Sequence, residues 1–457
     1  MQKIIFLIII TFLLSISLSI IVGSSAVGVS LIVFLFSAIY FCYLLGKKKN
    51  EDVNNLLIIL FVTFPLYLFY VLLVNANYIE SNSFFLYPDQ YGLFQDSEDL
   101  GNNESIIKIY QLCFVDRIHY EMEGFYFLMG VISYISNTFF EGNSVLLQSI
   151  HISFLAILTN LLMYKFLKNN GVQKNILKYT IIYAILSPIF FYSPWILRDI
   201  HIAFLFMVGF VLISSKFSFK NLLLLLFIIF LVFEFRVENA LFMIIFVPYY
   251  IIFKARSHRY FKLATFSFVL ILIISLPFLV ELLIPKFANT ITLLENYETY
   301  TLESLENQGL GRYLYRLPFG LKHIAIVLYS QITHFPPWAI IEISQTPYQL
   351  LIGIIALVKS VFWSLLFILS VISFFFKNAR KKLDISMLVL LFFFILYLFL
   401  NSSNINDRRL LAMYPILFLY VSNLKNSINK KLAYQLLKID IFIYFVMLSF
   451  YFFIKFV

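Results

Sequence analysis

The sequence predicts an all-α, polytopic membrane protein with about 13 transmembrane helices and two long outer-face loops. Two observations carry this prediction. The chain of 457 residues is 61% hydrophobic and only 13% charged, whereas about a quarter of the residues of a soluble protein are charged. Apolar runs of about 20 residues, the length that spans a bilayer core, recur along the whole chain. The net charge of +10 is therefore explained by membrane topology, and no nucleic-acid partner is expected.

The apolar runs also set the expected domain organisation. A signal peptide is the alternative for the first 22 residues, but a second apolar run follows at once and ends in three lysines, which favours a transmembrane hairpin. No polar stretch is long enough for a soluble domain, so residues 1–457 are predicted to form a single integral membrane domain. The expected spans lie near residues 4–22, 25–45, 56–75, 144–167, 178–197, 200–215, 221–236, 239–253, 263–284, 350–376, 383–400, 410–424 and 437–457.

Basic residues predict the orientation of these spans. If residues 47–49 are cytoplasmic and the spans alternate, 22 of the 34 Lys and Arg residues fall in cytoplasmic segments, while most acidic residues fall outside. The same alternation requires that residues 124–140 do not cross the membrane. They are predicted to form a re-entrant or surface helix inside an outer loop, residues 76–143, and a second outer region covers residues 285–349.

Arginine is concentrated on the predicted outer side. Positive-inside selection does not distinguish lysine from arginine, yet seven of the ten arginines lie outside. The planar arginine fork holds phosphate or carboxylate through two hydrogen bonds. An outer-face site for an anionic group explains this bias, and pairing with the abundant outer acids is the alternative. The outer arginines are Arg117, Arg198, Arg236, Arg312, Arg316, Arg408 and Arg409.

Residues 187–201 are the stretch around which we expect this site to form. An apolar run ends there in Arg198, Asp199 and His201, and another apolar run follows at once. Ionised groups beside hydrocarbon are functional candidates by default. On a helix, Arg198 and His201 would share a face, so His201 can join the anion site. The alternative is that His201 packs in the core and that acidic neighbours neutralise the arginine.

Two further places repeat this arrangement of charges at the end of a span. Arg236 lies between Glu234 and Glu238, and Asp407 precedes the adjacent Arg408 and Arg409. Alternation of the spans puts all of these arginines at one depth. We therefore predict that the phosphate ligands are Arg198, Arg236 and one of the pair Arg408 and Arg409.

The outer loop is rich in carboxylates that could act as a general base toward a sugar hydroxyl. Asp89 lies between two tyrosines, and Glu121 and Glu123 lead directly into residues 124–140. The run from Asp96 to Asp99 could hold a divalent cation, since hard cations take carboxylate oxygens. A solvated acidic loop is the alternative for this run. No metal and no cofactor are expected, because an arginine clamp can replace a metal.

These short motifs and the layout of spans and loops resemble bacterial polysaccharide polymerases of the Wzy and EpsG type, which belong to the membrane glycosyltransferases of the C-type fold. The similar motifs are Asp89-Gln-Tyr91, the stretch from Glu121 to Tyr126, and the arginines at span ends. The family's Glu-Pro-Gly-Phe type of sequence is matched only in part, because Met122 and Glu123 depart from it. The resemblance covers most of the chain by topology and about a tenth by residue.

The resemblance implies a reaction and a location. The substrates would be oligosaccharide repeat units on an undecaprenyl diphosphate carrier, at the outer face of a bacterial cytoplasmic membrane, with the N-terminus in the cytoplasm. The product would be an O-antigen made for lipopolysaccharide biosynthesis, a capsule or an exopolysaccharide. Besides membrane lipids, a chain-length regulator protein would be a partner. The arginines would stabilise the departing diphosphate, and Asp89, Glu121 or Glu123 would deprotonate the acceptor hydroxyl.

Two rival functions remain open. A transferase of the same fold class would move one sugar from a polyprenyl monophosphate, and an outer-loop carboxylate such as Asp89 or Asp96 would then matter more. A lipid-linked oligosaccharide flippase belongs to a different class. Flippases need charges that line a cavity at mid-membrane, and transporters often contain inverted repeats. The arginines at span ends, the long outer loops and the lack of a visible repeat favour an enzyme.

Overall fold

The computed structural model describes residues 2–47, 49–87, 89–118, 122–140, 142–255, 317–318, 320–331, 336–376, 384–400 and 407–456. Throughout these ranges the secondary structure is helical and contains no β-strand. Within the described ranges, seven helices are long and apolar enough to cross a membrane: Ile5–Val22, Ser25–Gly46, Asn50–Ser81, Val145–Asn169, Val237–Ala255, Pro347–Phe375 and Lys430–Phe453. The predicted class, an all-α protein of the multi-pass membrane type, is confirmed at this level. The larger number of predicted spans stays a prediction.

The helices divide into two compact units, and the chain passes between them several times. The first unit comprises residues 1–211, 230–236 and 334–363, and the second comprises residues 212–229, 237–333 and 364–457. The prediction of a single membrane domain is not tested by this division.

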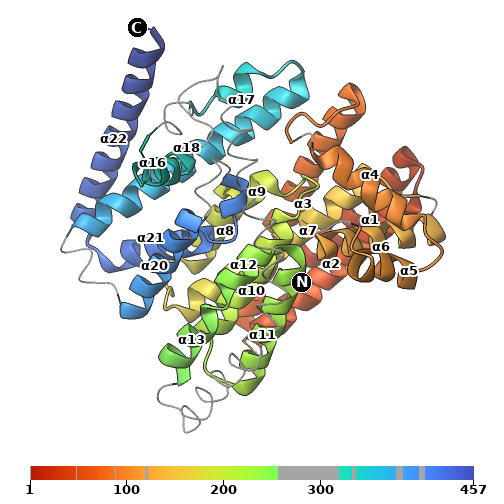
Figure 1. Ribbon diagram of the computed structural model, residues 1–457, viewed down its shortest axis with the longest axis horizontal. Helices are drawn as coiled ribbons and strands as arrows, with labels where there is room; N and C mark the ends of the chain where they lie inside the picture. Colours follow the sequence, from red (N-terminus) through yellow and green to blue (C-terminus); the bar gives the residue numbers. More distant parts are fainter. Residues whose placement is uncertain are drawn as a thin grey trace. The chain divides into compact units, whose positions relative to one another are not determined.

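The first unit is built on α1 (Gln2–Val22), α2 (Ser25–Gly46), α3 (Asn50–Ser81) and α7 (Val145–Asn169), which pack beside one another (Figure 1). Gly28 lets α1 and α2 approach closely, because a Cβ at this position would lie 2.6 Å from the Ser15 carbonyl oxygen. Most of α7 is buried, whereas α1 exposes many isoleucine and phenylalanine side chains. That contrast is expected if α7 is an inner helix and α1 faces lipid.

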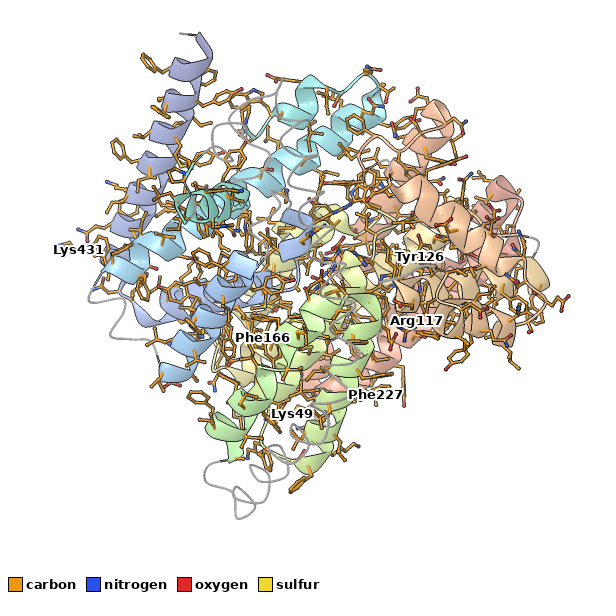
Figure 2. All side chains as sticks on the ribbon, viewed as in Figure 1. Lys49, Arg117, Tyr126, Phe166, Phe227 and Lys431 are labelled. Atoms are coloured by element: carbon orange, nitrogen blue, oxygen red, sulfur yellow. The ribbon has the colours of Figure 1, made fainter. Side chains whose placement is uncertain are left out.

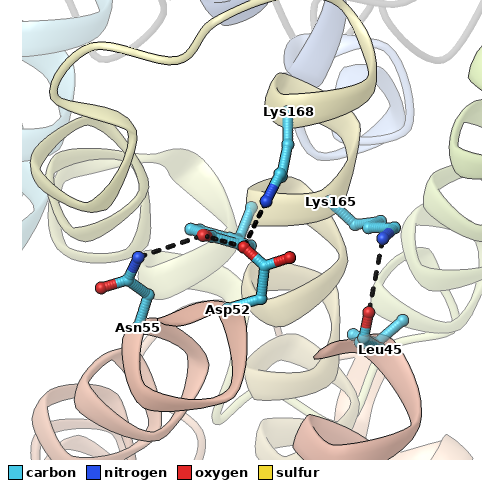
Figure 3. A network of polar contacts seen from close by, with 6 residues as sticks. Leu45, Asp52, Asn55, Lys165 and Lys168 are labelled. Carbon is cyan, nitrogen blue, oxygen red and sulfur yellow. Dashed lines mark hydrogen bonds and ion pairs between the residues drawn. The ribbon is translucent and has the colours of Figure 1, made fainter. Parts of the chain in front are cut away.

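Polar contacts connect the ends of α2, α3 and α7 (Figure 3). The Lys168 ammonium forms an ion pair with the buried carboxylate of Asp52. The Tyr164 hydroxyl donates to the same Asp52 oxygen at 2.9 Å, and Asn55 donates to Tyr164 at 3.1 Å. Lys165 donates to the Leu45 carbonyl oxygen at 3.4 Å. The lysines near the end of α7 therefore lie at the same end of the bundle as the α2–α3 turn, as the alternation of spans requires.

The predicted outer loop, residues 76–143, is largely helical. After the end of α3 it contains α4 (Asp89–Gly101), α5 (Ile106–Tyr110), the π-helical turn η1 (Gln111–Val115) and α6 (Glu123–Phe139). The expectation that the acidic run after Asp96 is a solvated loop is therefore wrong, since the run lies on α4. The helix is held by packing on α6, where a Cβ on Gly101 would lie 2.8 Å from the Ser133 backbone. Hydropathy cannot reveal such contacts, because α4 is polar.

The same unit contains α8 (Ile176–Leu186), α9 (Pro188–Tyr192), most of α10 (Asp199–Ser214), the last turns of α11 (Phe219–Phe235), α17 (Ala339–Glu342) and the first half of α18 (Pro347–Phe375). The expected span 178–197 is broken into α8, α9 and a non-helical stretch, residues 193–198. Pro188 and Pro194 explain the breaks, because proline lacks an N–H and disfavours helix in the residue before it.

The second unit contains α12 (Val237–Met243), α13 (Phe246–Tyr250), η2 (Ile251–Ala255), α16 (Leu321–Ser330), α20 (Ile385–Leu400), η3 (Asp407–Leu410), α21 (Tyr414–Ser427) and α22 (Lys430–Phe456). The Tyr397 hydroxyl joins α20 to α12 through the Asn239 side-chain oxygen at 3.1 Å. Helix α22 exposes large apolar side chains, among them Phe442 and Phe450. This surface is suited to lipid.

Candidate functional site

Two helix breaks in the first unit lie against each other. Arg198 is the last residue before α10, and Arg236 separates α11 from α12. The expectation that Arg198 and His201 share one helix is therefore wrong, because α10 begins only at Asp199. The Arg198 carbonyl oxygen accepts the first bond of that helix, from Ile202 N–H at 3.2 Å. Nothing in the local sequence accounts for the break at Arg236.

Each helix break contributes an arginine side chain that bonds to a residue at the other break. The Arg236 guanidinium Nη1 contacts Asp199 Oδ1 at 3.2 Å, and both side chains are more than nine-tenths buried. Arg198 Nη1 donates to the Phe235 carbonyl oxygen at 3.2 Å. A cation beside the last carbonyls of α11 is favoured by the negative end of the helix dipole. The predicted alternative, an acidic neighbour that pairs with an arginine, thus holds for Asp199, and its partner is Arg236.

The Asp199 contact uses one donor of the Arg236 guanidinium. Within the described ranges it is the side chain's only ion pair and only hydrogen bond. A guanidinium has five N–H donors, and donors left unfilled in a poorly hydrated place cost about 1–3 kcal/mol each. The Arg236 side chain is 9% exposed, and a further hydrogen-bond acceptor could reach the guanidinium through this exposed part. Asp199 therefore orients Arg236 and leaves it able to bind an anion.

The start of α6 packs against the end of α11. A Cβ on Gly124 would lie 3.1 Å from both the Cβ and the carbonyl oxygen of Glu234, so glycine permits this approach. Glu123, the first residue of α6, is only 2% exposed. Its carboxylate is thus placed in the same unit as the arginines but is covered by protein.

His201 lies among aromatic rings. Its ring centroid is 5.4 Å from Phe235, 5.5 Å from Phe125 and 5.5 Å from His151. Neither imidazole nitrogen makes a hydrogen bond to any residue that the structure describes. These surroundings match the packing alternative for His201 and place its ring against the same Phe235 whose carbonyl oxygen binds Arg198.

A carboxylate–tyrosine pair that sequence reasoning missed lies near Arg198. The Tyr126 hydroxyl (Figure 2) donates to Asp96 Oδ2 at 2.9 Å, joining α6 to α4. Burial is the main cause that raises the pKa of Tyr126, the Asp96 carboxylate adds to it, and the Arg198 guanidinium opposes it. Unlike Glu123, Asp96 is half-buried and can be reached from outside. The only sequence signal for this pair was the place of Asp96 two helical turns after Asp89. That signal can be used only if α4 is recognised as a helix.

Asp89 is the exposed first residue of α4. Its neighbour Gln90 is buried and accepts from Ile196 N–H at 2.8 Å, while its own amide donates to the Leu86 carbonyl oxygen at 2.8 Å. Gln90 therefore fixes the start of α4 to the non-helical stretch before Arg198. This contact places Asp89 beside residues 187–201.

Of the remaining predicted site residues, one lies outside the described ranges and two belong to the second unit. Glu121 lies outside the described residues. Arg408 and Arg409 form part of η3 in the second unit, where the Arg409 carbonyl oxygen accepts from the Tyr397 hydroxyl at 3.0 Å. Their role as phosphate ligands stays a prediction. Among the residues with described positions, no group of three or more His, Cys, Asp or Glu side chains could hold a metal ion.

The geometry combines two chemical capacities in one unit. Guanidinium groups held at adjacent helix breaks can bind an anionic oxygen, and a half-buried carboxylate near them can accept a proton. Comparison with family models, with curated proteins and with solved structures finds no match.

Proposed function

We propose that this chain is a membrane glycosyltransferase that polymerises oligosaccharide repeat units carried on undecaprenyl diphosphate. The observation that carries the proposal is the pair of helix breaks at Arg198 and Arg236. They put a buried guanidinium, which uses one of its donors among the described residues, next to the Phe235 carbonyl that binds a second arginine. Charged groups at membrane depth mark substrate sites by default.

In the proposed reaction the bond between C1 of the donor sugar and the terminal phosphate oxygen breaks. A hydroxyl oxygen of the acceptor repeat unit forms the new bond to C1, its proton passes to a carboxylate, and the carrier diphosphate leaves. Arg198 and Arg236, with Arg408 or Arg409 as predicted partners, stabilise the charge that develops on the leaving diphosphate. This role requires no group beyond the side chains of the chain itself.

The base is one of the outer carboxylates. Asp89, Glu121 and Glu123 are the candidates from the sequence, and the geometry adds Asp96. The hydroxyl of Tyr126 donates to one Asp96 oxygen, which orients the carboxylate. Because Asp96 is more accessible than Glu123, it is the carboxylate that we expect to meet a sugar hydroxyl.

A lipid-linked oligosaccharide flippase is the second candidate, and one observation favours it. Broken helices whose ends carry charges are typical of transporters, in which half-helix ends bind the substrate. The breaks between α8 and α10 and between α11 and α12 have this form. A transferase that moves a single sugar from a polyprenyl monophosphate is a third reading of the same site.

The length of the glycan on its carrier separates these functions. Surface glycan is resolved by gel in a strain that lacks the gene, complemented with the wild type, Arg236→Met, Asp96→Asn or the control Lys108→Met, with the membrane level of each variant measured. Lys108 is an exposed cation of the same predicted outer loop. We expect single repeat units in the deletion strain, a restored ladder with wild type and Lys108→Met, and no ladder with Arg236→Met or Asp96→Asn.

The other functions give different patterns. Repeat units that accumulate on the cytoplasmic leaflet would identify a flippase, and repeat units that lack one sugar would identify the single-sugar transferase. A full ladder from Asp96→Asn would return the role of base to Asp89, Glu121 or Glu123.

A further inference from the structure

The end of α7 and the turn between α2 and α3 hold a lysine whose donors are largely unused. Lys165 is half-buried, and Figure 3 shows its ammonium directed at the Leu45 carbonyl oxygen, to which it donates at 3.4 Å. Within the described residues this is its one hydrogen bond. An ammonium has three donors, so two of them have no protein acceptor in this part of the chain. An anionic oxygen from outside the chain could fill them.

The charged groups around Lys165 leave it in a positive potential. Lys47, Lys49 and Lys168 are near enough to repel its ammonium. Asp52 is the carboxylate that opposes them most strongly, and it is already ion-paired with Lys168. The cations of Lys47, Lys49 and Lys165 are therefore not neutralised by this carboxylate. A cluster of one sign attracts a counter-ion, and here the counter-ion is an anion.

The surface of α2 beside these lysines is suited to lipid. Tyr40, Tyr43 and Leu44 lie in the last two turns of α2 and are 65%, 53% and 52% exposed. Tyrosine is enriched where a membrane meets water, and an exposed leucine next to it fits hydrocarbon. The lysines that follow are thus at the depth of lipid headgroups. A phosphate that reaches Lys165 at this depth is expected to belong to a lipid.

We propose that Lys165, together with Lys47 and Lys49, binds the phosphodiester of an anionic phospholipid. A phosphodiester has two free oxygens that share one negative charge, so it can accept from more than one ammonium and join the end of α7 to the α2–α3 turn. Lysine is sufficient for this role because it binds phosphate as a point charge, and basic pockets between membrane helices bind lipid headgroups in this way. None of these lysines belongs to the arginine site, so the inference does not depend on the proposed function.

The test measures the affinity of the full-length protein for phosphatidylglycerol by native mass spectrometry, with zwitterionic phosphatidylcholine as the reference lipid. Wild type should bind phosphatidylglycerol about tenfold more tightly than phosphatidylcholine. Lys165→Met, which removes the charge and keeps the length of the side chain, should weaken phosphatidylglycerol binding about tenfold, as expected for loss of one charge-assisted contact. Lys165→Arg should retain it. The matched control is Lys178→Met, the same change at an exposed lysine near the start of α8, which should leave the affinity unchanged.

A second variant separates lipid binding from folding. Lys47 ends α2 with a φ of 37°, in the left-handed region that favours glycine. Lys47→Gly removes a cation and relieves the backbone. It should therefore weaken phosphatidylglycerol binding several-fold, while the SDS concentration at half-unfolding without added lipid stays the same or rises. A lysine with a merely structural role would leave the lipid affinity unchanged. This variant also decides the question if Lys165→Met does not fold.

Three outcomes would overturn the inference and leave the proposed polymerase function standing. The first is equal affinity of wild type for the two lipids. The second is a loss in Lys178→Met as large as that in Lys165→Met, because the attraction would then come from the overall charge of the surface. The third is an unchanged affinity in Lys47→Gly. Displacement of the bound lipid by inorganic phosphate would identify a site for a soluble anion and refute the lipid assignment.

Discussion

The buried pair of Asp199 and Arg236 gives the sharpest test of the site's architecture. Arg236→Met leaves the Asp199 carboxylate, 6% exposed, without this cation, and Asp199→Asn leaves the guanidinium, 9% exposed, without its one ion pair among the described residues. Removal of one partner of a buried pair costs about 3–5 kcal/mol. The two side chains share a single hydrogen bond of 3.2 Å, so we expect about 3 kcal/mol for each single variant, at the lower end of that range.

The double variant distinguishes the energy of the Asp199–Arg236 pair from the effect of each substitution on its own surroundings. Because neither side chain is left with an uncompensated charge, Asp199→Asn combined with Arg236→Met should be less destabilised than the sum of the singles, with a coupling free energy of about 1–3 kcal/mol. Unfolding by SDS in mixed micelles can be followed through tryptophan fluorescence, since the fully buried Trp195 lies three residues before Arg198.

Control variants and the activity complete this experiment. Glu104→Gln and Lys108→Met, both at exposed positions, should change the free energy of unfolding by less than about 0.5 kcal/mol. If the destabilisations of the two single variants sum to that of the double variant within about 0.5 kcal/mol, the reasoning is refuted, because independent sites behave in that way. If Arg236 also binds substrate, the double variant should regain stability without regaining polymerisation.

Three further predictions concern the rest of the first unit. Asp52→Asn should lower the free energy of unfolding by about 1–3 kcal/mol in the same SDS titration, because it removes the ion pair with Lys168 and leaves Tyr164 a neutral acceptor in place of a charged one; an equal loss in Glu51→Gln, an exposed neighbour, would contradict this. Gly101→Leu should separate α4 from α6 and abolish the ladder, whereas Gly92→Ala, which has open space around it, should stabilise α4 by up to about 1 kcal/mol. Single cysteines at Lys49 and Asn170 should react with an impermeant thiol reagent from the same side of the membrane, and labelling from opposite sides would overturn the shared end of α2, α3 and α7.

The membrane class could be read from the sequence because hydropathy is a local property. A run of apolar residues buries itself in lipid whatever its neighbours are. For the same reason the ranges of α1, α2 and α7 lie close to the predicted spans. The breaks around α9 were readable from Pro188 and Pro194, since proline acts on its own backbone and on the residue before it. The concentration of arginine at span ends likewise required only counting.

Pairing was decided by the tertiary structure alone. Asp199 and Arg236 are 37 residues apart, and nothing in either neighbourhood selects this partner over the nearer Glu234 or Glu238. Asp96 and Tyr126 meet because α4 packs on α6 through small residues, and the polar composition of α4 hid that it is a helix. The contact of Lys359 with the Phe191 and Tyr192 rings likewise depends on how α18 packs on α9, which neither helix specifies alone. Composition and periodicity specify what each segment can bury, whereas the identity of a partner depends on which helices come together.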